Sequence, residues 1–137
     1  MTRRQGKKMV WKLNLDEELE EGNVYGYVTN AEMDVQLKNY LEKQEVSGAI
    51  GTIQNQYEMV AILTNMYIEE DYRGQGIGTM LMENFISKAS SKGADAVILI
   101  ADTGERNEFG LVEWYENYGF NVIYGDKHSF PLMLKEL

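Results

Sequence analysis

The chain has 137 residues, of which 44% are apolar, and it carries 22 acidic and 13 basic residues for a net charge of −9. This length suits one core, so we expect residues 1–137 to form a single domain. The absence of cysteine excludes disulfides, thiolate catalysis and cysteine-ligated zinc, and a lone histidine, His128, excludes a multi-histidine metal site.

The charge balance and the apolar pattern also bear on partners and on location. A net negative charge disfavours nucleic acid, which requires a basic face, and favours encounter with cationic partners. The sequence holds no run of about eighteen apolar residues, so we expect no membrane span and no membrane partner. The basic start, MTRRQGKKMVW, is not followed by the apolar segment of a signal peptide. Together with the absence of cysteine, these features lead us to expect residence in the cytoplasm.

The first half of the chain is predicted to alternate between strands and one helix. Apolar alternation and turn residues place the elements in this order: strand 9–15, acidic turn 16–22, strand 24–29, helix 31–43, strand 47–53, hairpin turn 55–56 and strand 57–68. Asn30 is a suitable N-cap for the helix. The last strand is apolar on both faces at its centre, which is typical of a buried central strand.

The second half begins with a glycine-rich loop and then alternates between helices and strands. The elements follow in this order: a helix to about residue 92, strand 96–101, helix 108–118, strand 120–124 and strand 130–135. Gly93 is the predicted C′ residue of the first helix, and Pro131 favours an edge position for the final strand. A helical connection between strands 57–68 and 96–101 predicts that these two strands are parallel.

The loop Arg73-Gly74-Gln75-Gly76-Ile77-Gly78 leaves a strand and opens a helix. Backbone N–H groups and the helix dipole meet there, which favours an anion such as phosphate, and glycines keep side chains away from it. The pattern is neither the nucleoside-triphosphate loop, which ends in Gly-Lys-Ser/Thr, nor the dinucleotide pattern Gly-x-Gly-x-x-Gly. The residues alone therefore predict a phosphate-bearing ligand without naming it.

Three segments resemble the GNAT superfamily of N-acetyltransferases. The loop fits that family's acetyl-CoA pattern, (Arg or Gln)-x-x-Gly-x-(Gly or Ala); LVEWYENYGF at 111–120 resembles its tyrosine helix, and FPLMLKEL its last strand. The resemblance covers residues 48–137. It implies an α/β (α+β) fold with a mixed central sheet of six to seven strands flanked by helices. It further implies that two parallel strands splay apart to form the acetyl-CoA cleft, and that a homodimer can form.

The resemblance also assigns residue roles. The pyrophosphate of CoA is expected on the backbone amides of the loop, with Arg73 and Gly74 shaping it. The loop donors are Gln75, Gly76, Ile77, Gly78 and Thr79. The pantetheine arm is expected to pair with Met66, Tyr67 and Ile68, and a backbone N–H near Met66 to hold the developing oxyanion. Tyr115 matches the tyrosine that protonates the leaving thiolate, while Tyr118 is read as a core residue.

Two roles are less sharply assigned. Asn107 lies eight residues before Tyr115, one more than in the family pattern, so Asn107 is a weak CoA contact and Arg106 an alternative. The general base is expected to be a carboxylate, with Asp102 and Glu69 as the leading candidates. Further candidates are Glu58, Glu70 and His128.

The function that follows is transfer of an acetyl group from acetyl-CoA to a primary amine by direct attack. The acceptor is a small amine, a polyamine or a protein amino group, and the acidic surface favours a cationic one. Two alternatives stay open: a CoA-binding or regulatory module without catalysis, and a nucleotide-binding protein that uses the loop for another phosphate.

Overall fold

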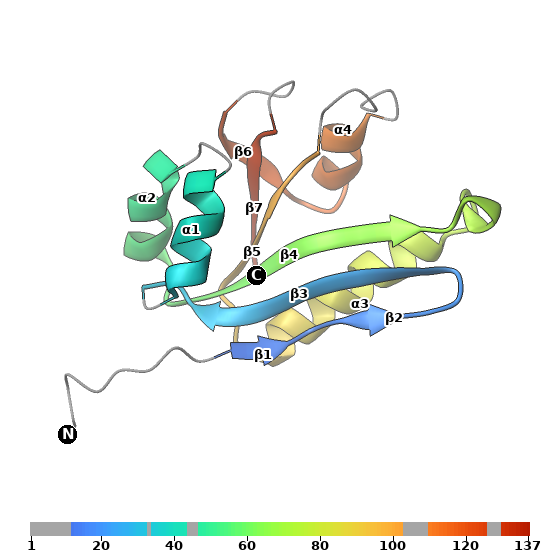
Figure 1. The fold of residues 1–137 in the computed structure, drawn as a ribbon, viewed down its shortest axis with the longest axis horizontal. Coiled ribbons are helices and arrows are strands. Elements are labelled where there is room, and N and C mark those ends of the chain that lie inside the picture. The colour runs from blue at the N-terminus through green and yellow to red at the C-terminus, as the bar shows by residue number, and fades with distance from the viewer. Residues whose placement is uncertain (1–11, 33, 44–46, 103–109, 126–129) are drawn as a thin grey trace.

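The structure is a computed structural model, and it describes residues 12–32, 34–43, 47–102, 110–125 and 130–137. Its centre is a seven-stranded sheet in the order β1-β3-β4-β5-β7-β6, with β2 pairing separately with β3 (Figure 1). The strands are β1 (Lys12–Asn14), β2 (Glu17–Glu18), β3 (Gly22–Asn30), β4 (Met59–Ile68), β5 (Ala96–Ile100), β6 (Asn121–Tyr124) and β7 (Leu132–Glu136).

Strands β4 and β5 run parallel, and the other described pairs are antiparallel. The predicted mixed sheet and its parallel pair are thus confirmed. The helix between them, α3 (Ile77–Ser91), ends before Gly93, which has the positive φ of 90° expected of a C′ residue.

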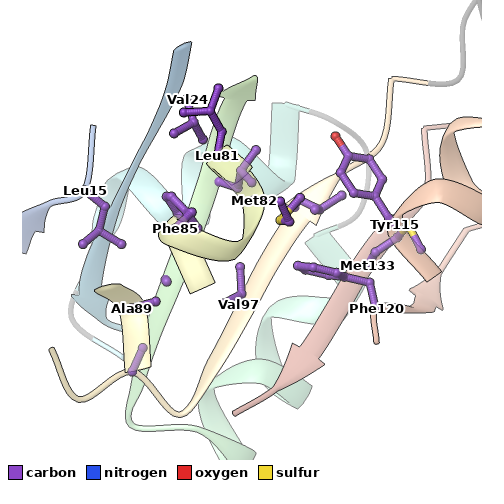
Figure 2. Close-up of a cluster of buried hydrophobic side chains, with 14 of the residues drawn as sticks. Leu15, Val24, Leu81, Met82, Phe85, Ala89, Val97, Tyr115, Phe120 and Met133 are labelled. Atoms are coloured by element: carbon purple, nitrogen blue, oxygen red, sulfur yellow. The ribbon is translucent and has the colours of Figure 1, made fainter. Parts of the chain in front are cut away.

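Successive residues of each central strand point to opposite sides of the sheet, so apolar side chains line both faces. Helices cover both of these faces. Helices α1 (Val35–Lys43) and α2 (Ile50–Gln56) pack on the face that carries Val60, Ile62 and Ile98. Helices α3 and α4 (Leu111–Glu116) pack on the other face, in the cluster of buried side chains shown in Figure 2. Burial on both faces explains the unbroken apolar centre of β4.

One predicted strand is wrong. Residues 47–53 form a short 3-10 helix, η2 (Ser47–Ala49), and the start of α2, and Asn55-Gln56 lies in that helix instead of a hairpin turn. The small residues give only a weak strand pattern, and Ile50 and Ile53 are three residues apart, which is a helical spacing. Packing decides instead, because Ile53 is fully buried against the α1 face of the sheet.

Two smaller predictions also need correction. Asn30 is the last residue of β3, and α1 begins four residues later than predicted, after Asp34, whose Oδ1 accepts a hydrogen bond of 3.3 Å from the Leu37 amide. Strand β7 is not an edge, since it lies between β5 and β6. Pro131 precedes β7, so it removes no hydrogen bond from that strand, and its carbonyl accepts one from Ala101 at 3.0 Å.

Candidate functional site

The site begins at an irregularity in β4. Tyr25 faces Asn65 in the β3–β4 register, whereas the next residue of β3, Gly26, faces Leu63, so Thr64 is an extra residue on β4. This is a β-bulge, and the Thr64 hydroxyl donates a 3.0 Å hydrogen bond to the carbonyl of Tyr25 across it. A bulge bends its strand and increases the local twist.

The parallel pairing between β4 and β5 stops at the same place. It covers Val60–Leu63 and Ala96–Leu99, whereas β4 continues to Ile68 in contact with β3 alone among the described strands. Figure 1 shows the two strands diverging from there. The predicted splayed pair is therefore present, and it begins at the bulge at Thr64.

The backbone of β4 beyond the bulge directs polar groups into this opening. The Glu69 amide donates to the Glu21 carbonyl at 2.8 Å, so odd-numbered residues here form the hydrogen-bonded pairs with β3. The N–H and C=O groups of Met66 and Ile68 consequently face the other way, toward β5. Consistent with this, the Ile68 carbonyl accepts from Arg73 Nε at 3.0 Å.

The glycine loop follows β4 after a short 3-10 turn, η3 (Glu70–Tyr72). Gly74 and Gly76 have φ values of 79° and 83°, and a Cβ at either position would meet no atom within 4 Å. Gly76 is the N-cap of α3, where no described side chain caps the helix and no acidic residue occupies the first turn. The amides of Ile77, Gly78 and Thr79 precede the first intrahelical hydrogen bond, Met80 N to Gly76 O.

Arg73 fixes the loop to the end of β4. Besides its bond to the Ile68 carbonyl, its guanidinium lies over the Tyr67 ring, 5.6 Å from the centroid. The Tyr67 side chain is 43% exposed, so it offers an accessible face for this contact. Gln75 also closes the loop by donating from Nε2 to the Asp71 carbonyl at 3.2 Å.

Helix α4 supplies Tyr115, which is only 7% exposed and packs edge-on against Trp114 and Phe120. Figure 2 shows its hydroxyl pointing away from Phe120. Trp114 in turn lies over the first turn of α3, because a Cβ on Gly78 would lie 3.4 Å from its Cζ2. The structure thus places the helix of Tyr115 directly against the glycine turn.

Tyr118 differs from its sequence interpretation. It is half-buried at the margin of the cluster instead of central in the core, and its hydroxyl lies 2.6 Å from that of Thr79. The sequence patterns did not predict Trp114 or Tyr118 as neighbours of the loop. Their four-residue spacing, which puts them on one side of a helical segment, was the available signal.

The carboxylate candidates lie at different ends of β4. Asp102 follows β5 and Glu69 follows β4, so both sit where the parallel strands end, and both are exposed. Glu58 precedes β4, eight residues before Met66, a distance of about 26 Å along an extended strand. Asn107, Arg106 and His128 lie outside the described residues.

Carboxylates also collect beside the loop, where the turn before β3 meets η3. We call Glu18, Glu20, Glu21, Glu69, Glu70 and Asp71 the acidic margin. The Tyr72 hydroxyl donates to Glu20 Oε2 at 3.4 Å, and the charge of Glu20 is the main cause of a raised Tyr72 pKa. Burial first, then Glu18, raises the pKa of Tyr25. Of the two shifts, only that of Tyr72 has the charge of a neighbouring carboxylate as its main cause.

Residues 31–122 match the model of the acetyltransferase (GNAT) domain, which is more than half of the chain. The chain therefore belongs to the GNAT acetyltransferase family. A comparison with curated protein sequences found no significant match. No described helix is long and apolar enough to cross a membrane.

Solved structures share the fold at low sequence identity. A NatC complex bound to Gag peptide and CoA has a TM-score of 0.56 at 16% identity, over 85% of this chain and 60% of that one. PH1933 from Pyrococcus horikoshii has a TM-score of 0.55 at 16% identity, over 88% of this chain and 62% of that one. An agmatine N-acetyltransferase mutant, in apo form, has a TM-score of 0.61 at 10% identity, over 85% and 69%. The chain thus spans less than two thirds of the first two proteins.

Proposed function

We propose that this protein is an N-acetyltransferase that moves an acetyl group from acetyl-CoA to a primary amine. The observation that carries the proposal is the parting of β4 from β5 at the Thr64 bulge, just before an uncapped helix start with open glycine backbone. An extended arm fits along backbone groups that face the opening, and a diphosphate fits on the helix amides. The arm and the diphosphate are two successive parts of CoA.

The residues present suit that ligand and the chemistry. Bound acetyl-CoA supplies an acetyl group activated as a thioester. In this proposal the Met66 N–H, which faces away from β3, donates a hydrogen bond to the thioester oxygen and stabilises the charge that develops there. The Tyr115 phenol is the proton donor for the departing sulfur, since a donor of this kind lowers the charge on a leaving thiolate.

The acceptor is proposed to be a cationic amine. The chain's net charge of −9, to which the acidic margin contributes, favours encounter with a cation. Asp102 and Glu69, at the ends of the two parting strands, remain the proposed bases that take a proton from the ammonium. Agmatine and peptides, named for the similar structures, represent the two acceptor classes to be compared.

Cytoplasmic residence and a homodimer belong to the same proposal. The first rests on the absence of cysteine and the second on family resemblance alone. Sedimentation of the purified protein decides between monomer and dimer.

The test is a Tyr115→Phe variant, which removes one hydroxyl and keeps the ring contacts with Trp114 and Phe120. We expect kcat on a panel of amines to fall about a hundredfold, the loss typical of a missing general acid, while CoA affinity stays within about twofold. Tyr57→Phe is the matched control, because Tyr57 lies at the opposite end of β4 and its phenol contacts Glu136.

Three outcomes decide the proposal. Loss of turnover in Tyr115→Phe but not in Tyr57→Phe supports it. Binding of CoA without turnover by the wild type, across small amines, polyamines and peptides, would favour the regulatory module. Stabilisation by ATP or NAD but not by CoA would favour a different nucleotide ligand.

A further inference from the structure

The Tyr118 hydroxyl reaches the turn that the proposed function assigns to the diphosphate. It lies 2.6 Å from the hydroxyl of Thr79, which is exposed and belongs to the first turn of α3. Tyr118 itself follows α4, the helix of Tyr115. One side-chain hydrogen bond therefore joins the two elements on which binding and proton donation depend.

Backbone contacts carry this link from Tyr118 to Tyr115. The Tyr115 carbonyl accepts hydrogen bonds from the Tyr118 amide at 2.9 Å and from the Phe120 amide at 3.3 Å. The Trp114 ring packs edge-on against both tyrosines, with centroid distances of 5.3 Å and 4.9 Å. A displacement of Tyr118 would consequently move the backbone and the aromatic neighbour of Tyr115 together.

We propose that Tyr118 is a positioning residue that couples the diphosphate site to the proton donor. This inference rests on the proposed function. In the free protein the hydroxyl pair is exposed to water, where a hydrogen bond contributes little. A diphosphate on the adjacent amides displaces water, and the lower local dielectric strengthens the bond. Occupation of the α3 turn thereby holds α4, with Tyr115, in the reacting position.

Comparing the kinetics with two acetyl donors distinguishes a positioning role of Tyr118 from a purely structural one. Acetyl-CoA carries the diphosphate, whereas S-acetylpantetheine has the same thioester and arm without it. Tyr118→Phe keeps the ring contact with Trp114 and removes only the hydroxyl. We expect kcat/KM for acetyl-CoA to fall about three- to tenfold, the equivalent of one net hydrogen bond, and kcat/KM for S-acetylpantetheine to stay within about twofold.

Thr79 provides the matched variants. Thr79→Val should reproduce the loss, and Thr79→Ser, which keeps the hydroxyl, should lose less than Thr79→Val. The Tyr118→Phe/Thr79→Val double variant should be no worse than either single one. An equal loss with both donors, additive single losses, or unchanged kinetics in Tyr118→Phe would each overturn the inference.

A binding readout keeps this test separate from that of the proposed function. The chain has two tryptophans, so Trp11→Phe leaves Trp114 as the only one. CoA should change Trp114 emission, pantetheine should change it less, and Tyr118→Phe should abolish that difference. A wild type that shows no response and no stabilisation with CoA refutes the proposed function itself. A response to CoA that Tyr118→Phe leaves unaltered refutes only the coupling.

Discussion

Gly26 lies in the middle of β3, where the backbone approaches both a neighbouring strand and the core. A Cβ at this position would overlap the Ile62 carbonyl oxygen and lie 2.6 Å from two ring atoms of Phe85. Gly26→Ala should therefore lower the free energy of unfolding by about 3 kcal/mol, because the added methyl group would have to displace the backbone of β4 or the buried Phe85 ring. Urea denaturation followed by circular dichroism measures this loss.

Gly51 is the matched control at the residue scale. It lies in α2, and a Cβ there would meet no atom within 4 Å. Gly51→Ala should raise the free energy of unfolding by about 0.5 kcal/mol, because alanine loses less backbone entropy in a helix. Equal effects of the two substitutions would show that close approach at Gly26 is not what excludes a side chain.

Single residues also show what the sequence could and could not predict of the site. The three glycines after Arg73 predicted an open turn because glycine clusters are costly without a local reason, and positive φ values at Gly74 and Gly76 supply that reason. The contact between Tyr118 and Thr79 joins residues 39 positions apart. No local pattern encodes such a pairing, since it depends on how α4 packs against α3.

At the scale of elements, α1 depends on its first residues. Asp34 is 3% exposed, caps the helix through the Leu37 amide, and lies 3.6 Å from Lys12 Nζ. Asp34→Ala should lower the free energy of unfolding by about 1–2 kcal/mol, because it removes a cap and the partner of Lys12. Asp34→Asn keeps the capping oxygen and should lose less. A loss in Asp34→Asn as large as in Asp34→Ala would assign the effect to charge, not to capping.

The order of helices and strands in the second half could be predicted from the sequence, because its apolar segments are long and glycines mark where the helices end. The first half was harder. Residues 47–53 have small side chains that suit strand or helix, so burial of Ile53 decided the outcome. The bulge in β4 left a faint signal in the sequence, Thr64-Asn65, two consecutive polar residues after an apolar run. Alternation of apolar and polar residues with a period of two predicts an uninterrupted strand, so it does not reveal the extra residue of a bulge.

At the scale of the whole molecule, Tyr57 ties the region before β4 to the end of β7. Its hydroxyl donates to Glu136 Oε2 at 2.6 Å, and burial, followed by the Glu136 interaction, raises its pKa from 10.0 to about 12. The folded state thus keeps a proton that the unfolded chain releases near pH 10. Stability from this group is complete below pH 10 and is lost as pH rises toward about 12.

Urea denaturation at pH 8 to 11 tests this dependence. The wild type should lose stability across the alkaline range. Tyr57→Phe should lose less over the same range because it lacks the phenol at position 57, whose pKa differs between the folded and unfolded states. Parallel curves for the two proteins would contradict the assignment of the pKa to Tyr57.

We expect the amides at the start of α3 to hold the diphosphate of CoA. Calorimetric titration of CoA into two glycine variants tests this most directly. Gly76 and Gly93 stand at opposite ends of α3 with φ values of 83° and 90°, and a Cβ at either position would meet no atom within 4 Å, so alanine strains both backbones alike. We predict that the wild type and Gly93→Ala bind CoA alike and that Gly76→Ala binds at least about tenfold more weakly, a loss of about 1.4 kcal/mol. Equal CoA affinity in both variants, or no binding by the wild type, would contradict the account.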